Sequence, residues 1–157
     1  VGVIHNGHII QEGTPGMVFR RPVNKFVARY TGIRNFFRVN YFREDGIWKA
    51  RCDGNLVFRM SDDEYPREGL MILRSDSIKI STDKPDCIVN NCFKGIVKEL
   101  IPAEYGMEVT VDAGEKFYID VSGEDAGKLD IKETSEVWIS FAPGAGVALQ
   151  GEIKDKI

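Results

Sequence analysis

The sequence predicts an all-β fold, a small barrel or sandwich that follows an opening hairpin and two short helices. Aromatic and β-branched residues dominate short segments from Ile33 onward, and several of these segments alternate apolar with polar residues. Turn residues separate the segments every ~8–12 positions. Many short strands with regular turns are typical of small barrels and sandwiches.

Residues 1–11 predict a β-hairpin. Asn6 and Gly7 stand between two apolar runs, and both central positions of a type I′ turn need the positive φ that these residues adopt. His5 and His8 then face each other across the turn. Because two ligands alone rarely hold a metal ion, we interpret this pair as solvated cross-strand neighbours.

Two short helices are predicted next. Thr14 suits an N-cap and Pro15 suits the first helical position, while Pro22 ends the helix. The second helix runs from Asn24 to Gly32. A hairpin and two short helices cannot bury a core alone, so we expect their packing partner to lie in missing upstream sequence. Exposed apolar surface is expected near Val18, Phe19, Phe26 and Val27.

The remaining segments predict strands in two groups. The first group covers 33–43, 47–51, 55–60, 69–74 and 77–81, and the second covers 91–101, 107–111, 117–121 and 136–141. The apolar run at 70–73 is typical of a strand covered on both faces. A polar stretch at 82–86 indicates a linker between two lobes. Ser122 is the expected N-cap of a helical turn before the last strand.

Composition excludes several classes of protein. Of the 157 residues, 43% are apolar and 29% are charged, with a net charge of −3. This balance predicts a soluble globular protein without a strong attraction to nucleic-acid phosphates or anionic lipid. No apolar run approaches the ~20 residues that span a bilayer. The first residues show no initiator Met or secretory signal and read as a chain cut from a longer one.

Three cysteines, Cys52, Cys87 and Cys92, indicate a cytoplasmic protein with free, partly buried thiols. The spacing of Cys87 and Cys92 superficially suggests a metal clip. A zinc site needs about four ligands, and no second pair of Cys or His lies nearby. No metal site is therefore expected.

Specific motifs in both halves resemble one protein family. In the first 32 residues they are Asn6-Gly7, Ile10-Gln11, Gly13-Thr14-Pro15, Val18-Phe19, Pro22, Phe26-Val27-Ala28 and Gly32. In the β-half they are Gly32-Ile33-Arg34-Asn35, the stretch 73–78, the stretch 91–97 with Asn91, Gly95 and Val97, and Ser140-Phe141. Order and spacing are similar to those of ABC importer ATP-binding subunits that carry a C-terminal transport-associated, oligonucleotide-binding-like domain.

The resemblance implies a division of the chain. Residues 1–32 resemble the end of a nucleotide-binding domain. Residues 33–157 are expected to form an OB-like (MOP-like) regulatory and dimerisation domain, with lobes at about 33–82 and 87–150. The whole protein would couple ATP hydrolysis to solute uptake, at the cytoplasmic face of the cell membrane. Its partners would be a second copy and membrane permease subunits.

No residue of this chain is expected to bind nucleotide or to catalyse hydrolysis. A phosphate-binding loop needs Gly-x-x-x-x-Gly-Lys-Ser/Thr, and no such run occurs in the sequence. Mg-ATP would bind in the missing nucleotide-binding domain. The carboxylate clusters Asp62-Asp63-Glu64 and Glu124-Asp125 have no nucleophile or His at a recognisable spacing, so we interpret them as charged turns rather than as parts of an enzyme.

Some members of this family bind a transported oxyanion such as molybdate. Candidate anion-binding residues here are Asn90, Asn91, Lys94 and Ser122. The sequence departs from the binding pattern in two places, since Ile88-Val89-Asn90-Asn91 replaces Ser-Ala-Arg-Asn and Ala142 stands where a Lys is common. A domain that only dimerises is the simpler interpretation.

A stand-alone OB-like module that binds single-stranded nucleic acid or an oligosaccharide is the alternative. The aromatic residues available for stacking are Phe36, Phe37, Tyr41, Phe42 and Trp48. Single-strand binders pair such residues with a basic groove. The net negative charge argues against nucleic acid as a partner.

Overall fold

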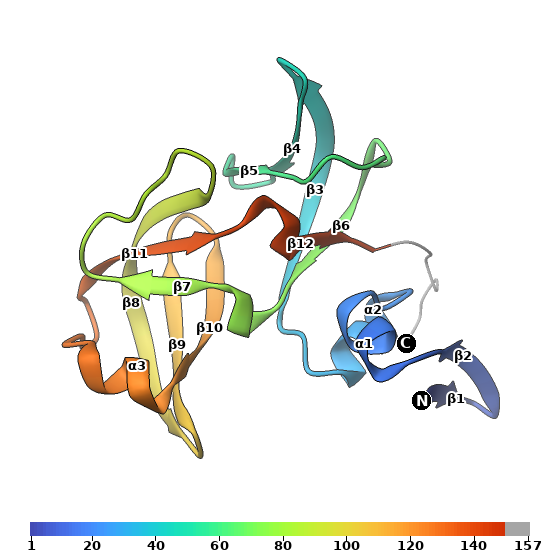
Figure 1. Ribbon diagram of the computed structural model, residues 1–157, viewed down its shortest axis with the longest axis horizontal. Helices are drawn as coiled ribbons and strands as arrows, with labels where there is room; N and C mark the ends of the chain where they lie inside the picture. The colour runs from blue at the N-terminus through green and yellow to red at the C-terminus, as the bar shows by residue number, and fades with distance from the viewer. Residues whose placement is uncertain (150–157) are drawn as a thin grey trace.

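The computed structural model describes residues 1–149. It contains a two-stranded hairpin, two helices and two five-stranded antiparallel sheets, with a third helix beside the second sheet (Figure 1). The predicted all-β fold after an opening hairpin and two helices is confirmed. Residues 150 and 157, the predicted ends of the second lobe and of the domain, lie outside the described residues. No described helix is long and apolar enough to cross a membrane.

The opening hairpin and helices form where local signals predict them. β1 (Gly2–His5) pairs with β2 (His8–Glu12), with His5 opposite His8. Asn6 and Gly7 form the turn with φ values of 52° and 78°. α1 (Pro15–Arg20) begins after Thr14, whose Oγ1 accepts a hydrogen bond from the Met17 amide, and α2 (Lys25–Tyr30) begins after the N-cap Asn24.

These first elements bury a small core of their own. Val18 and Val27 are fully buried and pack with Val3. The expectation that both valines would be exposed is wrong, because the hairpin and two helices close around them. Phe19 stays 41% exposed. The other exposed apolar residues of this segment are Val1, Ile4, Ile9, Met17 and Tyr30.

The first five-stranded sheet has the order β12-β6-β3-β4-β5. Its strands are β3 (Asn35–Glu44), β4 (Ile47–Cys52), β5 (Val57–Arg59), β6 (Glu68–Leu73) and β12 (Gly146–Ala148). Met71 and Leu73 pack in the main core, while Ile72 packs with Ala28 and Ile33 on the opposite face. The prediction that this strand is covered on both faces is confirmed, and its outer face attaches α2 to the sheet.

The second sheet has the order β10-β9-β8-β11-β7. Its strands are β7 (Lys79–Ser81), β8 (Asn91–Ala103), β9 (Gly106–Asp112), β10 (Lys116–Ser122) and β11 (Glu136–Phe141). The helix α3 (Gly123–Lys128) begins after Ser122, whose Oγ accepts a hydrogen bond from the Asp125 amide. Ser122 is therefore the helix N-cap, as the sequence predicts.

The two sheets exchange strands. After β6, the 3-10 turn η1 (Ser75–Ser77) leads β7 into the second sheet, where it pairs with β11. After β11, the equivalent turn η2 (Pro143–Ala145) leads β12 back to β6 (Figure 1). β12 was not among the predicted strands. Each sheet thus includes a strand from the other half of the chain, and the expected linker at 82–86 follows β7 rather than separating the sheets.

Register shows that the halves are structural repeats. Asn35 pairs with Leu73, and Asn91 pairs with Phe141 at the same place in the second sheet. The sheets pack over one shared core with an aromatic centre formed by Phe37, Phe58, Phe93, Phe117 and Phe141. Because this core takes residues from both sheets, the two halves bury their apolar faces against each other.

Candidate functional site

A cavity lies where the N-terminal segment meets the β-region. Its volume is about 640 Å³, and its walls come from α1, η1, η2 and β12. The lining includes Phe19 and Arg20 from α1, Arg74 and Asp76 beside β6, and Val147 from β12. Parts of the chain that are far apart in sequence therefore meet at this junction.

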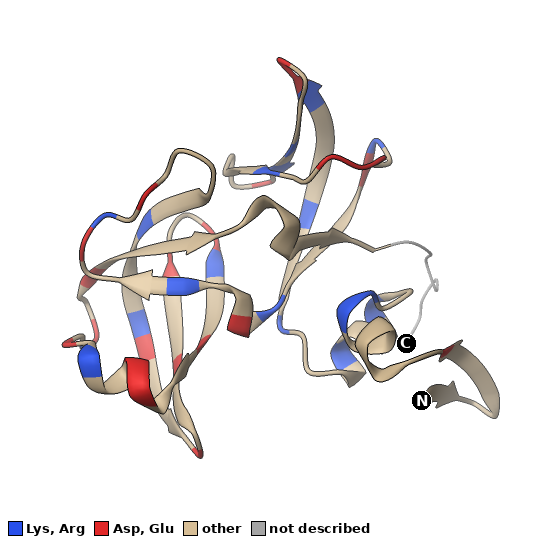
Figure 2. Ribbon diagram, in the orientation of Figure 1, with Lys and Arg blue, Asp and Glu red and all other residues tan. Residues whose placement is uncertain are grey.

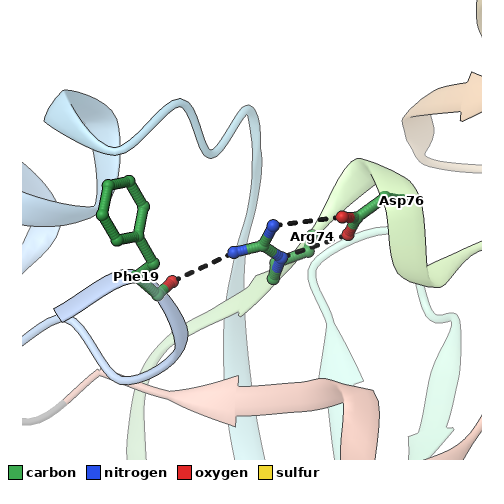
Figure 3. A network of polar contacts seen from close by, with 3 residues as sticks. All are labelled: Phe19, Arg74 and Asp76. Atoms are coloured by element: carbon green, nitrogen blue, oxygen red, sulfur yellow. Dashed lines mark hydrogen bonds and ion pairs between the residues drawn. The ribbon is translucent and has the colours of Figure 1, made fainter. Parts of the chain in front are cut away.

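Arg74 connects the two sides of the junction. Its Nε donates to Asp76 Oδ1 at 3.1 Å and its Nη2 to Asp76 Oδ2 at 3.0 Å, while its Nη1 donates to the carbonyl oxygen of Phe19 at 3.3 Å (Figure 3). The hydrogen bond and charge of Arg74 lower the pKa of Asp76, and Arg20 adds to the effect. A planar guanidinium can hold a carboxylate and a backbone carbonyl together. Arg74 therefore joins the last turn of α1 to the β-region.

A second cavity, of about 740 Å³, lies between β7, β10 and α3. Its polar lining includes Asp76, Asp120 and Asp125 together with Lys79 and Lys128. Ile78, Ile80, Val121 and Leu129 supply apolar walls. Figure 2 shows that charges of both signs are spread along this part of the molecule.

Asp120 has the most informative electrostatics of the second cavity. Asp120 is exposed at the surface, yet partial desolvation raises the pKa of its carboxyl, and the nearby Glu108 and Asp76 raise it further, whereas Arg34 and Arg74 lower it. Arg34 itself lies 3.6 Å from Glu108 and over the ring of Tyr118, 4.9 Å from its centroid. A cation bound nearby would stabilise the ionised form of such a carboxyl group, which its surroundings disfavour.

The structure gives Asn91 a role in holding the sheets together. Its Oδ1 accepts from the Arg59 amide at 2.7 Å, and its Nδ2 donates to the Arg59 carbonyl at 3.0 Å. Asn91 is buried, and these bonds fix β8 to the edge strand β5 of the other sheet. Both polar atoms of its side chain are thus already engaged.

The other candidate anion-binding residues do not gather around Asn91. Asn90 is exposed beside it. Lys94 lies 3.5 Å from Glu136 on the neighbouring strand. Ser122 lies opposite Gly106, which also pairs with Ala103 at the far end of β8. Within one copy of the chain, the four candidates therefore occupy opposite ends of the second sheet.

The aromatic residues of the alternative nucleic-acid or oligosaccharide hypothesis are not arranged as a stacking platform. Phe37 and Tyr41 are buried in the core. Phe42 lies under the guanidinium of Arg51, and Trp48 packs on Tyr65. These rings already have intramolecular partners.

The two carboxylate clusters are exposed, the first in a turn and the second, against the sequence interpretation, in the first turn of α3. Asp62, Asp63 and Glu64 are exposed between β5 and β6, and Glu124 lies 3.7 Å from Lys128 within α3. Among residues 1–149, no group of three or more His, Cys, Asp or Glu side chains is placed to hold a metal ion.

Asn35 is the counterpart of Asn91 and was not predicted as a structural residue. Its Nδ2 donates to the Tyr118 carbonyl and its Oδ1 accepts from the Tyr118 amide, both at 2.8 Å. A signal existed, since Asn35-Phe36-Phe37-Arg38 and Asn91-Cys92-Phe93-Lys94 share an Asn-x-Phe-basic pattern. The repeated pattern indicates a paired structural role for the two asparagines.

Several known proteins with similar sequences are ATP-binding proteins of import systems. The chain is 30% identical over 152 residues to the spermidine/putrescine import ATP-binding protein PotA of Thermotoga maritima, a match that covers 91% of the chain and 41% of the relative. It is 28% identical to PotA of Thermobifida fusca, over 96% of the chain and 40% of the relative. The Fe(3+) ions import ATP-binding protein FbpC of Escherichia coli O157:H7 is 24% identical, over 76% and 37%. The chain thus spans about two fifths of these relatives, and no family model matches it.

The fold also resembles a solved structure. The cytoplasmic molybdate-binding protein ModG, in a crystal form with molybdate bound, superposes with a TM-score of 0.63 at 14% identity. The match covers 76% of this chain and 98% of ModG. It confirms the predicted OB-like (MOP-like) fold class, and at this identity it supports the fold alone.

Proposed function

We propose that this chain, a C-terminal transport-associated β-region of an ABC importer ATP-binding subunit, regulates the ATPase of that subunit and contributes to its dimerisation. The hydrogen bond from Arg74 to the Phe19 carbonyl carries this proposal. Phe19 belongs to the segment that resembles the end of the nucleotide-binding domain, and Arg74 belongs to the β-region. A displacement on one side is therefore passed to the other through a short, oriented contact.

The whole protein in this proposal binds and hydrolyses Mg-ATP in a part of the nucleotide-binding domain that is not contained in residues 1–157, and uses the energy for solute import. It acts with permease subunits at the cytoplasmic face of the membrane. The relatives named for spermidine/putrescine and Fe(3+) import support this role. Residues 1–32 complete the nucleotide-binding domain, and residues 33–157 form the regulatory domain.

The test is Mg-ATP hydrolysis by the full-length protein assembled with its permease. Arg74→Ala is expected to change the rate while leaving the thermal unfolding midpoint near that of the unaltered protein, because the contact is small and partly exposed. Arg67→Ala, another exposed arginine on the β-region, is the matched control and should leave the rate unchanged. Equal rates in all three proteins, or no hydrolysis by the full-length protein, would contradict the proposal.

Dimerisation has a candidate surface in the loop before β8. Ile88 is 79% exposed and Val89 is 65% exposed, side by side. Two adjacent branched apolar residues in water favour burial against a second copy. Sedimentation of the chain should show a dimer that Ile88→Asp converts to monomer, whereas Tyr105→Asp, at an equally exposed residue elsewhere, should leave it dimeric. A monomer at all concentrations would reject dimerisation through this region.

Two classes of ligand are candidates for the regulatory domain, an oxyanion and an organic cation, and they would occupy different places in the structure. Oxyanion binding by Asn90, Asn91, Lys94 and Ser122 needs a second copy, since one copy holds them at opposite ends of a sheet. Asn91 would also have to release its two hydrogen bonds to Arg59. The second cavity favours a cation, because Asp76 is paired with Arg74 and Lys128 with Glu124, which leaves Asp120 and Asp125 beside the single Lys79.

A thermal-shift comparison of molybdate, tungstate, putrescine and spermidine distinguishes the two ligand classes. A shift with the oxyanions that disappears in Ile88→Asp supports the site between copies. A shift with the polyamines that disappears in Asp120→Asn supports the cavity. No shift with any compound at millimolar concentration would leave dimerisation as the role of the domain.

A further inference from the structure

We propose that Cys87 and Cys92 form a reversible dithiol–disulfide site, whose co-substrate is a low-molecular-weight disulfide. The inference goes beyond the importer assignment and does not depend on it. Cys87 lies in the loop that leads from β7 into β8, and Cys92 is the second residue of β8, opposite Ser140 of β11; both thiols are half-buried. Modification there is possible without unfolding the protein.

The two thiols are held together by the loop backbone. Cys87 Sγ donates to the Pro85 carbonyl at 3.2 Å, and Cys92 Sγ donates to the carbonyl of the adjacent Asp86 at 3.7 Å. Beyond the effect of burial, Cys87 is also close enough to Cys92 to raise the pKa of its thiol. The two side chains are therefore neighbours before any reaction, and residues 87–90, which have no helix or strand structure, can adjust to the geometry of a disulfide while Cys92 stays in β8.

Cys52 lacks these properties. It is buried in the main core, and burial raises the pKa of its thiol to about 12. A buried thiol that stays protonated is a poor nucleophile. Cys52 therefore serves as an internal control in the same chain.

The chemistry proceeds in two exchanges. The Cys87 thiolate attacks one sulfur of the small disulfide, which forms a mixed disulfide and releases one thiolate. Cys92, whose pKa is raised to about 11 by burial and by Cys87, then loses its proton and attacks the Cys87 sulfur, releasing the second thiolate. The protein loses two electrons and two protons, and the small disulfide becomes two thiols. Cys87 makes the first attack because it lies in the loop outside the sheet, whereas Cys92 is held in β8.

Oxidation at this site acts on the edge strand β5. The ring closed by the disulfide contains Ile88, whose carbonyl accepts from Arg59 Nη1 at 2.6 Å, and Asn91, which holds the Arg59 backbone. A change in the loop therefore reaches Arg59 directly. The equivalent contact of Asn35 with Tyr118 has no cysteine beside it.

The test treats the chain with oxidised glutathione, blocks remaining thiols and maps disulfides by mass spectrometry. The expected product carries a Cys87–Cys92 disulfide, which dithiothreitol reduces back to two thiols. Cys52 reacts with the blocking reagent only after the protein is unfolded. Cys92→Ser should instead accumulate glutathione on Cys87, and Cys87→Ser should react more slowly than Cys92→Ser. Stable glutathione adducts on the unaltered chain without an internal disulfide, or no reaction at either cysteine, would overturn the proposal.

Hydrogen exchange measures the effect on β5. Oxidation should change the exchange rate of the Arg59 amide and leave that of the Tyr118 amide, which Asn35 holds in the same way. An equal change in the exchange rates of the two amides would reject the link to β5. Whether the disulfide forms is decided separately by the mass-spectrometric mapping.

Discussion

The side-chain amide of Asn35 closes two hydrogen bonds of 2.8 Å with the backbone of Tyr118, which lies 83 positions further along the chain. Asn91 makes the same pair of contacts with Arg59 in the opposite direction. Each asparagine stands at the start of the central strand of its own sheet and holds an edge strand of the other. The two contacts join the repeats to each other. In each contact the side-chain amide both donates to and accepts from the backbone of one residue, as a peptide group does.

Asn35→Ala and Asn91→Ala should each destabilise the protein by about 1–3 kcal/mol, because each leaves backbone groups of Tyr118 or Arg59 without partners. Denaturant unfolding gives the free energies. The exposed Asn40 on the same strand as Asn35 provides the control, and Asn40→Ala should change the free energy of unfolding by less than ~0.5 kcal/mol. Similar values for all three variants would show that the contacts contribute little.

Arg74→Ala should loosen α1 without unfolding the β-region. Exposed ion pairs contribute only ~0.2–1 kcal/mol, so amide exchange in α1 should accelerate about two- to five-fold while exchange in β3 stays constant. Acid should have the same effect, since the lowered pKa of Asp76 means that its contribution is present above the ordinary value of 3.8 and is lost as pH falls through the folded-state pKa. Exchange in α1 that is insensitive to both changes would contradict this role of Arg74.

Asp120→Asn should raise the unfolding temperature at neutral pH. Because the pKa of Asp120 is raised in the folded protein, its ionisation favours the unfolded state, and this cost disappears below the ordinary value of 3.8. Thermal unfolding at several pH values should therefore show a gain that shrinks as the solution becomes acidic. Asp130→Asn, at an exposed carboxylate on the loop after α3, is the control, and a gain that is independent of pH would count against this explanation.

Gly95→Ala should destabilise the protein by about 1–3 kcal/mol through overpacking. A Cβ atom at Gly95 would lie 2.6 Å from Val111 Cγ1 and 2.8 Å from the Asp112 carbonyl oxygen, so the strands β8 and β9 would have to separate. Gly127 in α3 is the matched control, because a Cβ there meets nothing within 4 Å. Gly127→Ala should stabilise by up to ~1 kcal/mol, and denaturant unfolding of both variants checks the opposite signs.

Local signals predicted most elements because the residues that form them are close in sequence. The turn at Asn6-Gly7 and the N-caps at Thr14 and Ser122 involve contacts within a few residues, and the strand predicted at 136–141 matches β11. The junction and the cavities were not predicted, since Arg74 meets Phe19 and Asp76 meets Asp120 only after the sheets have packed.

The amino-acid order alone specified the succession of hairpin, helices and strands, through turn chemistry, caps and alternation that act over a few residues. It did not specify that β7 and β12 change sheets, or that Asn91 holds Arg59 instead of remaining free for a ligand. Those features depend on one apolar core shared by both repeats. Burying that core selects partners that are distant in sequence, and no local preference encodes such a choice.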